Sequence, residues 1–496
     1  MRIVASDLMS LYLPSPCSGR VIHRFRGEEE AEPTEFDRVL RELGRRHEQE
    51  HLQSLGAVVD LSRVPKEERF GKTLEAIAAR VAVIYQPAFR LMTSIDGIEC
   101  ELVGYPDFLI LNDDEYIIRD SKMARRIDDE HHPEIVLQVG LYGYLFEQAC
   151  GRIPKAIQVH SGTNAIVDVP YDGGVNAMAE LRRIIALRAT EGEFYEPVGW
   201  SKCSACGFKE KCWETAKQID DVAILPDVDQ SLAIALHGIG VTSISQLLQS
   251  FDITSLSEFK RPVGKRIQKV GKKAERILLF AESMKTKQEL VLAIPAIPSF
   301  PNYVMFDLEG MPPYLDETDK IYLWGMRVFG STGGEFMPAV AGFGPDGDRD
   351  GWLEFLRNAD SIFQACGDDI PFVHWASYEK THISQYSDRY GDPNGVAAHV
   401  KANLLDLLTI AHKSIVLPLP SFSLKVIEKH IGYQRTQEEY GGTWSIAQFI
   451  LATETRDEQL RAQIMDQILK YNDEDLEATW AVFEWLRGKN PSIPSA

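Results

Sequence analysis

Asp107, Asp120 and Lys122 are charged residues at the ends of apolar, strand-like runs. Asp107 precedes FLI in GYPDFLI, and Asp120 and Lys122 follow YII in YIIRDSK. Residues two apart on a strand point to the same face, so the Asp120 carboxylate and the Lys122 ammonium are expected to lie together. Carboxylates bind divalent metal and a lysine stabilises developing negative charge, which favours phosphodiester hydrolysis. By itself, a D-x-K pattern more often forms a surface salt bridge.

Gln138 and Tyr142 lie four residues apart in EIVLQVGLYGYLFEQAC, a stretch typical of a long helix. Residues four apart share one helix face. We expect the pair to position a nucleic-acid strand or the catalytic lysine. A half-buried helix face is the commoner meaning of such a pair, so the pattern gains weight only beside Asp107, Asp120 and Lys122.

A second set of carboxylates lies in the last part of the chain. Asp307 and Glu309 in FDLEG follow an apolar run and share a strand face, so both can bind metal. Glu379 lies at the strand-to-helix passage HWASYEK, and Tyr471 and Asp475 lie four apart in KYNDEDLEATW. Four carboxylates can hold two metal ions, and a tyrosine can orient the attacking water.

Four of the seven cysteines are suited to one metal or cluster site. Cys203, Cys206 and Cys212 lie in SKCSACGFKEKCW, and Cys17 lies near the N-terminus. Cytosolic thiols stay reduced, so disulfides are not expected. Four thiolates can bind an iron–sulfur cluster that clips the start of a domain to its end, or a zinc ion.

The composition is that of a soluble globular protein with several domains. The 496 residues exceed what one hydrophobic core holds, so two or three domains are expected. No apolar run is long enough to span a membrane and no signal segment opens the chain, so we expect a cytoplasmic protein. The net charge of −20 argues against a nucleic-acid coat protein, but it does not exclude a nuclease that gathers carboxylates around metal.

The order of predicted elements indicates an α/β protein of three domains. Residues 1 to about 220 combine helices, predicted at 35–55 and 72–86 among others, with strands in a mixed sheet. Residues 221–290 are predicted to be small and all-helical. LVLAIPAIPSFPN is predicted to be a linker, and residues 297–490 a second α/β domain, in which Asp406 is structural.

Glycine hairpins in the middle region suggest phosphate binding. Gly238-Ile239-Gly240 leads into a helical stretch, and Gly271 precedes two lysines. Both resemble helix-hairpin-helix elements, in which backbone N–H groups hold a DNA phosphate without reading sequence. Ordinary C-cap glycines are the alternative. The surrounding basic residues form either a phosphate-contacting patch or a solvated helix face: Lys260, Arg261, Lys265, Arg266, Lys269, Lys272, Lys273 and Arg276.

The ordered elements of the first domain resemble the RecB-like branch of the PD-(D/E)XK nucleases, in which the glutamine–tyrosine helix follows the D-x-K strand. The resemblance covers residues 1 to about 215. It implies a restriction-endonuclease-like fold that cuts DNA through Asp107, Asp120 and Lys122. The family also places a metal-binding histidine on its first helix, shortly after a glycine, which implies His47 in LGRRHEQEH. His51, one turn later, is the alternative.

The cluster-containing members of that family have one early cysteine and a late C-x2-C-x5-C group. Cys17, Cys203, Cys206 and Cys212 match this spacing. The resemblance therefore implies a [4Fe–4S] cluster at these four cysteines.

The last domain resembles the ribonuclease H-like, DnaQ-type exonucleases of the tyrosine (DEDDy) subclass. The match rests on Asp307, Glu309, Tyr471 and Asp475, with Glu379 standing where the family usually has aspartate. The resemblance implies removal of nucleotides from a 3′ end with Mg²⁺ or Mn²⁺.

As a whole, the chain resembles a bacterial family of predicted nucleases that join these two domain types. This implies a DNA nuclease with two metal sites, acting on single strands or free ends, with RNA as a second substrate option. The competing hypothesis is a protein that binds DNA ends or DNA structures and in which one or both nuclease sites are inactive.

Overall fold

The computed structural model describes residues 1–263, 266–311, 320–343, 346–437 and 441–489. Contacts within the chain divide it into two compact units. The first comprises Met1–Glu196 and Lys202–Lys211, and the second comprises Pro197–Ser201 and Cys212–Ala496. The residues predicted to form the middle and last domains both fall in the second unit.

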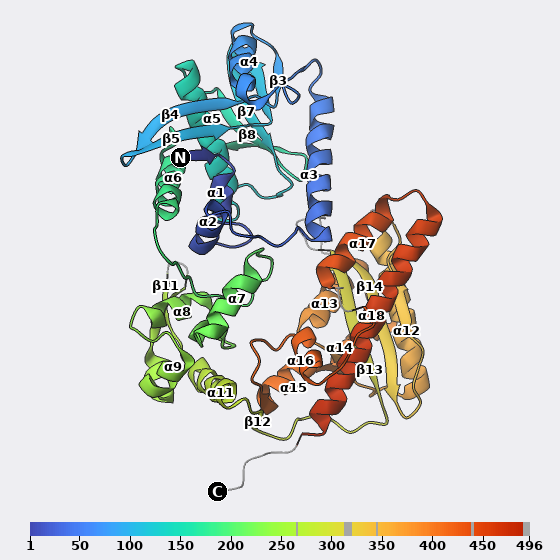
Figure 1. Ribbon diagram of the computed structural model, residues 1–496. Coiled ribbons are helices and arrows are strands. Elements are labelled where there is room, and N and C mark those ends of the chain that lie inside the picture. The colour runs from blue at the N-terminus through green and yellow to red at the C-terminus, as the bar shows by residue number, and fades with distance from the viewer. Residues whose placement is uncertain (264–265, 312–319, 344–345, 438–440, 490–496) are drawn as a thin grey trace. The chain divides into compact units, whose positions relative to one another are not determined.

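The first unit is built on a mixed six-stranded sheet with strand order β2-β3-β6-β7-β8-β9. Strands β7 and β8 run parallel, and β6 and β7 form an antiparallel hairpin. The six strands are β2 (Val59–Asp60), β3 (Val83–Tyr85), β6 (Phe108–Asn112), β7 (Glu115–Ser121), β8 (Ala156–His160) and β9 (Ile166–Val169). The predicted mixed sheet flanked by helices is therefore confirmed (Figure 1).

Helices and a second, three-stranded sheet complete this unit (Figure 1). That sheet has the order β1-β5-β4, with β1 (Arg2–Val4), β4 (Phe89–Ile95) and β5 (Ile98–Gly104). The helices are α1 (Asp7–Ser10), α2 (Ser18–Phe25), α3 (Glu35–Ser54), α4 (Lys66–Ala78), α5 (Pro133–Cys150) and α6 (Val175–Arg188), and α7 (Lys209–Gln218) follows. Thr34 and Asp37 form a capping box that starts α3.

The helix predicted at 72–86 is wrong in its second half. Helix α4 ends at Ala78, and Val83–Tyr85 is strand β3. Arg80 takes a left-handed φ of 57°, which a helix cannot continue. The β-branched Val83 and Ile84 then pair with β6 and are buried, so sheet pairing decided the outcome.

The middle region is not all-helical. Its helices are α8 (Gln230–His237), α9 (Ile244–Ser250), α10 (Ile253–Glu258) and α11 (Lys273–Thr286), with a 3₁₀ turn at Val222–Ile224. Between α10 and α11, β10 (Lys260–Val263) and β11 (Arg266–Lys269) pair as an antiparallel hairpin. Lys260, Arg261, Arg266 and Lys269 therefore lie on a hairpin, whereas Lys273 and Arg276 lie on helix α11. Lys265 lies outside the described residues.

The predicted linker begins with a short strand. Strand β12 (Leu290–Val291) pairs with β18 (Ile415–Val416), so the linker itself starts after Val291. The pairing satisfies backbone groups that an isolated linker would leave to water.

The rest of the second unit contains a five-stranded sheet with strand order β15-β14-β13-β16-β17. These are β13 (Asn302–Met311), β14 (Lys320–Gly330), β15 (Met337–Val340), β16 (Phe372–His374) and β17 (Leu404–Asp406). The helices are α12 (Gly347–Cys366), α13 (Tyr378–Tyr390), α14 (Val396–Ala402), α15 (Leu407–Ser414), α16 (Leu424–His430), α17 (Gly442–Glu454) and α18 (Glu458–Arg487), with a 3₁₀ turn at Pro393–Gly395.

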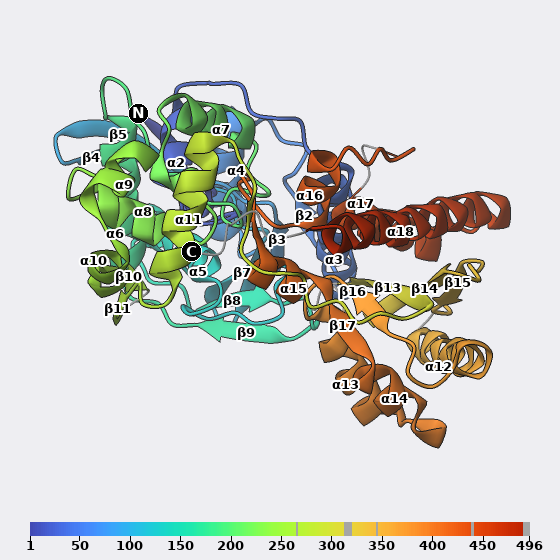
Figure 2. The same cartoon turned by 90° about the horizontal axis from the view of Figure 1, so that it is seen from below.

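Helices α12 and α18 cover opposite faces of this sheet (Figure 2). Successive side chains of β13 point to opposite faces of the sheet, as they do on any strand. Phe306 packs with Phe355 of α12, whereas Tyr303 packs with Phe483 of α18. Odd-numbered residues of β13 therefore face α18, and Asp307 and Glu309 are among them.

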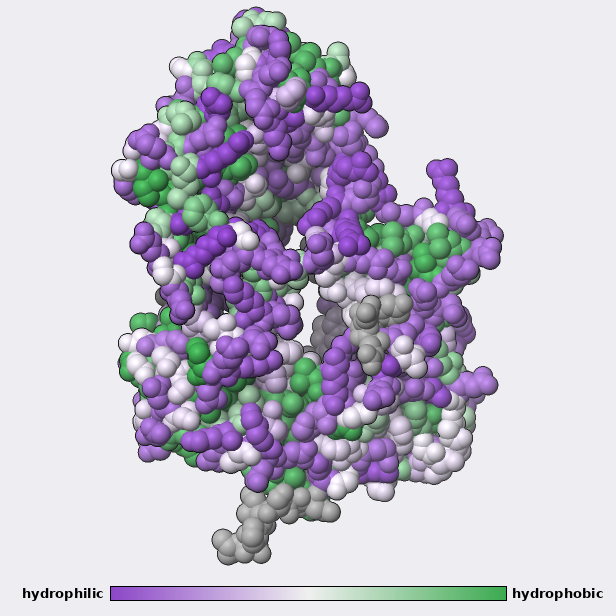
Figure 3. All heavy atoms as spheres, viewed as in Figure 1, coloured by the Kyte–Doolittle hydropathy of each residue, from purple (hydrophilic) through white to green (hydrophobic). Residues whose placement is uncertain are grey.

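Hydrophilic side chains cover most of the visible surface of each unit (Figure 3). Among the helices in the described ranges, none combines the length and apolar character that crossing a bilayer requires.

Candidate functional site

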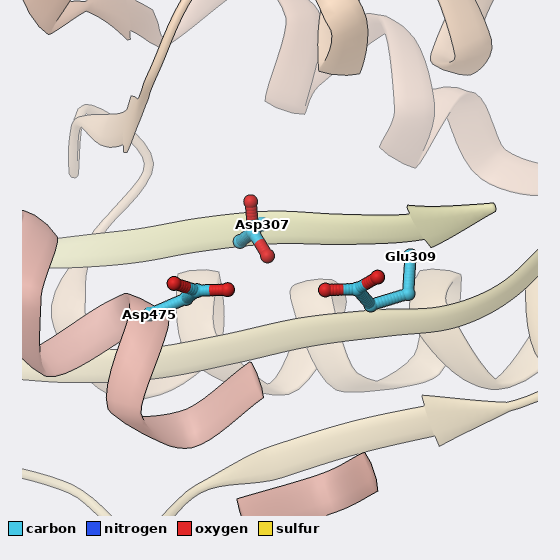
Figure 4. A group of neighbouring side chains, drawn as sticks. All are labelled: Asp307, Glu309 and Asp475. Carbon is cyan, nitrogen blue, oxygen red and sulfur yellow. The ribbon is translucent and has the colours of Figure 1, made fainter. Parts of the chain in front are cut away.

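Three carboxylates converge on the α18 face of the five-stranded sheet (Figure 4). Asp307 and Glu309 come from β13, and Asp475 comes from the middle of α18. One oxygen from each lies within 4.8 Å of the others. Glu309 and Asp475 are buried, and the register of β13 against β14 shifts directly after Glu309. Such a bulge re-aims side chains and is common beside active sites.

Each of the three carboxylates has a dedicated partner that fixes it. Asn472 Nδ2 donates to Asp307 Oδ2 at 2.7 Å, and the Tyr322 hydroxyl donates to Glu309 Oε2 at 3.3 Å. Arg435 Nη2 lies 2.5 Å from Asp475 Oδ1. These contacts orient the carboxylates before any ligand arrives.

The remaining predicted residues of this set lie close by. Glu379 is buried on α13 and is 3.0 Å from His374 Nδ1, outside the group of three, although its charge still acts on Asp307. Tyr471 is buried one turn before Asp475, and the charges of Asp475, Glu309 and Asp307 all raise the pKa of its hydroxyl beyond the effect of burial. Asp406 accepts from Thr409 N and caps α15, which confirms its structural role.

Burial and mutual repulsion make these carboxylates reluctant to ionise. Burial raises the pKa of Asp307 well above its usual range, and the Asp475 and Glu309 charges raise it further. Burial and Asp475 raise the pKa of Glu309 to about 8. Burial also raises the pKa of Asp475, although Arg435 and Lys425 oppose the shift. Acids crowded at such a distance are stable as anions only beside added positive charge.

The donor set matches a divalent cation. Hard cations such as Mg²⁺ and Mn²⁺ prefer carboxylate oxygens, and here three of them converge from two elements. Among the described residues, this is the one group of three metal-binding side chains at such spacing.

Sequence reasoning missed the residues that hold the carboxylates. Asn472 lies three residues before Asp475 on the same helix, and residues at this spacing are neighbours on the helix surface. The sequence therefore indicated that Asn472 would lie near the site. Arg435 and its partner Glu428 offered none, because they reach the site only through folding. Lys425, whose Nζ lies 4.9 Å above the Tyr471 ring, is a further cation at the site.

In the first unit, Asp107, Asp120 and Lys122 also come together. Lys122 Nζ lies 2.5 Å from Asp120 Oδ2, and Asp107 N donates to Asp120 Oδ1 at 3.3 Å. Burial and the Asp120 charge raise the pKa of Asp107 well above its usual range. Burial acts to lower the pKa of Lys122, but Asp120 and Asp107 outweigh it and raise the pKa.

Gln138 and Tyr142 share the buried face of α5, as the helical spacing predicts. Gln138 Nε2 donates to the Tyr142 hydroxyl at 2.8 Å. Burial raises the pKa of Tyr142, and Asp120 and Asp107 raise it further, so the hydroxyl faces their charges.

His47 of α3 lies beside this group. Its ring stacks on His160 at 4.2 Å, and Nε2 is 3.4 Å from the His160 carbonyl, which also accepts from Lys122 N. The His51 ring also stacks on the His160 ring, with their centroids 4.0 Å apart. The residue that sequence reasoning passed over is Glu48, which Gln86 bridges to Asp107 with bonds of 2.9 and 3.0 Å.

All seven cysteines are free of disulfides. Cys17 and Cys206 are far apart in sequence, yet both thiols act on the pKa of the buried Arg20, so the fold brings them to the same place. Burial and the Glu196 carboxylate raise the pKa of Cys17 to about 11. A ligand that needs its thiolate must therefore displace a proton.

The backbone N–H groups of the Gly238-Ile239-Gly240 hairpin already have partners. Every N–H from Gly238 to Ser243 donates within the chain, to carbonyls of α8 or to the Gln246 side chain. The predicted phosphate contact at this hairpin remains a prediction, and it requires the exchange of one of these bonds.

A model of the RNase H superfamily matches residues 304–487. Those residues carry the three carboxylates on a mixed α/β fold, and they form an RNase H-like domain. None of the curated proteins matches the chain.

Two solved structures are similar over part of the chain. SSO0001 is 13% identical with a TM-score of 0.22, covering 42% of this chain and 85% of that one. A protein from Eubacterium rectale named "Putative exonuclease" is 13% identical with a TM-score of 0.25, covering 39% and 83%. Likenesses at this level carry no argument about the site.

The raised pKa of Glu309 predicts a pH-dependent loss of stability without metal. An unfolded glutamate ionises near about pH 4.3, whereas folded Glu309 ionises near about 8. The folded state thus binds more protons between these values, so stability falls as pH rises through this window. In EDTA, the thermal midpoint of Glu309→Gln should equal that of wild type at about pH 4 and exceed it increasingly up to about pH 8. Equal slopes for both proteins would contradict the assignment.

Gly325 is predicted to be irreplaceable because it faces Asp307 across the sheet. A Cβ at this position overlaps the Asn472 Oδ1 atom, and Asn472 is fully buried. Gly325→Ala should destabilise the protein by about 1–3 kcal/mol, as overpacking does, and lower the thermal midpoint. Gly442→Ala is the control, because a Cβ there meets nothing within 4 Å. Adding Asn472→Ala should restore part of the loss; no rescue would show that the overlap is not the cause.

Proposed function

We propose that the chain is a metal-dependent nuclease whose RNase H-like domain trims nucleic acid from a 3′ end. The observation that carries the proposal is the convergence of Asp307, Glu309 and Asp475 within an RNase H-like fold. These three residues would hold Mg²⁺ or Mn²⁺. A bound ion supplies positive charge that stabilises the transition state of phosphodiester hydrolysis.

The chain's own residues do the positioning. Asn472, Tyr322 and Arg435 hold the carboxylates in place, so little reorganisation is needed when ligands arrive. The Tyr471 hydroxyl, already among the acids, orients the attacking water. Glu379 supplies a fourth carboxylate from α13 and is held by His374.

The first unit is proposed as a second, RecB-like nuclease site. Asp107 and Asp120 would bind the metal, with His47 as the further ligand that family resemblance suggests. Lys122 would stabilise charge on the phosphate from its place beside Asp120. Gln138 and Tyr142 would hold the strand or the lysine. The support is the buried contact between Lys122, Asp120 and Asp107.

DNA is the proposed substrate, with single strands and free ends preferred and RNA as the second option. Support comes from the β10–β11 hairpin and the turn after it. There Lys260, Arg266 and Lys272 form no ion pair with any described residue. On a protein with a net charge of −20, cations without an acidic partner are the side chains best able to attract a phosphate. If neither site turns over, the chain is better described as a DNA-binding or scaffolding protein.

The two sites are predicted to act independently, since their ligands come from different units. Lys122→Ala should abolish cutting at the first site and leave 3′-end trimming unchanged. Asp307→Ala with Glu309→Ala should do the reverse, because residues without shared contacts contribute additively. Digestion of end-labelled DNA with Mg²⁺ or Mn²⁺ by wild type, each mutant and the combination measures this.

The control for that experiment is Lys72→Ala, which removes an exposed lysine paired only with Glu75. It should digest DNA as wild type does. Loss of all activity in Lys122→Ala alone would mean that the RNase H-like domain is inactive and serves for binding.

The cysteines are proposed to hold a [4Fe–4S] cluster, with zinc as the alternative. Protein purified without oxygen should be brown and contain about four irons. Cys203→Ser should lose the colour and the iron and lower the thermal midpoint, whereas Cys366→Ser, an isolated cysteine, should keep both. Colourless protein containing zinc would overturn the cluster assignment.

A further inference from the structure

Arg435 lies near the carboxylates of the RNase H-like domain. It contacts two acidic side chains, and one of its guanidinium nitrogens forms no hydrogen bond within the part of the chain that the structure describes. Its Nε and Nη2 donate to Glu428 at 2.8 and 2.6 Å, a two-pronged contact. The same Nη2 lies 2.5 Å from Asp475 Oδ1. Only 5% of its side chain is exposed, and Glu428 is buried as well.

The third nitrogen of Arg435 has no partner. Nη1 is buried and forms no hydrogen bond with any described residue. The guanidinium is planar, and Glu428 occupies its Nε–Nη2 edge. Nη1 belongs to the other edge of the same guanidinium, whose Nη2 lies 2.5 Å from Asp475 Oδ1. A buried donor left without an acceptor costs about 1–3 kcal/mol, so an acceptor oxygen placed at Nη1 would recover that cost.

We propose that Arg435 binds a non-bridging oxygen of the phosphate at the 3′-terminal linkage, through Nη1. Arginine suits this task because its fork can hold Glu428 and Asp475 while a further N–H pair contacts the phosphate. Glu428 anchors the guanidinium, so that the contact costs little side-chain entropy. This inference rests on the proposed function, and it adds a substrate-binding residue outside the carboxylate set.

The test is binding of a 5′-labelled single-stranded oligonucleotide in Ca²⁺, so that no turnover is required. One oligonucleotide carries a normal 3′-terminal phosphate linkage, and the other carries an uncharged methylphosphonate there. Wild type should bind the methylphosphonate at least tenfold more weakly. Arg435→Gln should show a penalty at least threefold smaller, because one of the two positive charges that sense the phosphate is gone and only the bound ion remains. An equal methylphosphonate penalty in wild type and Arg435→Gln would overturn the proposal.

Two controls separate this contact from a structural role. Arg327→Gln removes an arginine that also contacts two carboxylates of α18, Asp473 and Glu477, and it should keep the wild-type penalty. Glu428→Gln keeps Arg435 but loosens its anchor, and it should reduce the penalty without removing it. If Arg435→Gln does not fold, Arg435→Lys replaces it and should show a penalty at least threefold smaller than wild type. An unchanged penalty in Arg435→Lys or Glu428→Gln would count against the proposal.

Trimming in a Lys122→Ala background distinguishes this inference from the proposed function. Arg435→Gln should trim about 100-fold more slowly, as when one transition-state donor is removed, whereas Mn²⁺ affinity by paramagnetic resonance should fall at most tenfold, because Arg435 also helps to orient Asp475. Wild-type trimming with no loss in Arg435→Gln would overturn this inference alone. A parallel loss of Mn²⁺ affinity would show that Arg435 only positions Asp475. Absence of both Mn²⁺ binding and trimming in the Lys122→Ala parent would overturn the proposed function instead.

Discussion

Repulsion among three crowded carboxylates, two of them buried, is the main physical constraint on the site of the RNase H-like domain. Asp307, Glu309 and Asp475 lie within 4.8 Å of one another, where burial and like charge oppose ionisation. A fold whose purpose was stability alone would not gather them, since apolar side chains in the same place would pack without that cost. Neutral donors fix two of the acids, and an arginine fixes the third. The arrangement stores unfavourable electrostatics that a cation relieves.

The surrounding fold keeps this cluster in place. On one face of the sheet, Phe306, Trp324, Trp352 and Phe355 form an aromatic core against α12. On the other face, α18 packs against β13 and brings Asp475 to Asp307. The even-numbered residues of β13 pack into this core, so Asp307 and Glu309 on the opposite face do not have to contribute to it. Gly325 leaves the room that Asn472 needs to reach Asp307.

Local sequence patterns predicted most of the helices and strands. The predictions failed where contacts between residues distant in sequence determine the structure. The period-two pattern of β13 and the four-residue spacing of Tyr471 and Asp475 were enough to place the site residues. The strand Val83–Tyr85 was missed because pairing with β6 overrides a helical pattern. The β10–β11 hairpin was missed because basic side chains suit an exposed strand as well as a helix face. Arg435 was not predictable, since it lies outside the helices and its partners Glu428 and Asp475 come from α16 and α18.

The central claim is that Asp307, Glu309 and Asp475 bind a divalent cation for nuclease chemistry. A crystal of the full chain grown with Mn²⁺ tests it directly through anomalous scattering from the metal. We predict a peak among these three side chains, within coordinating distance of their oxygens, and its loss in Asp307→Ala crystals. A map with no peak among them, while Mn²⁺ occupies sites elsewhere on the chain, would contradict the account.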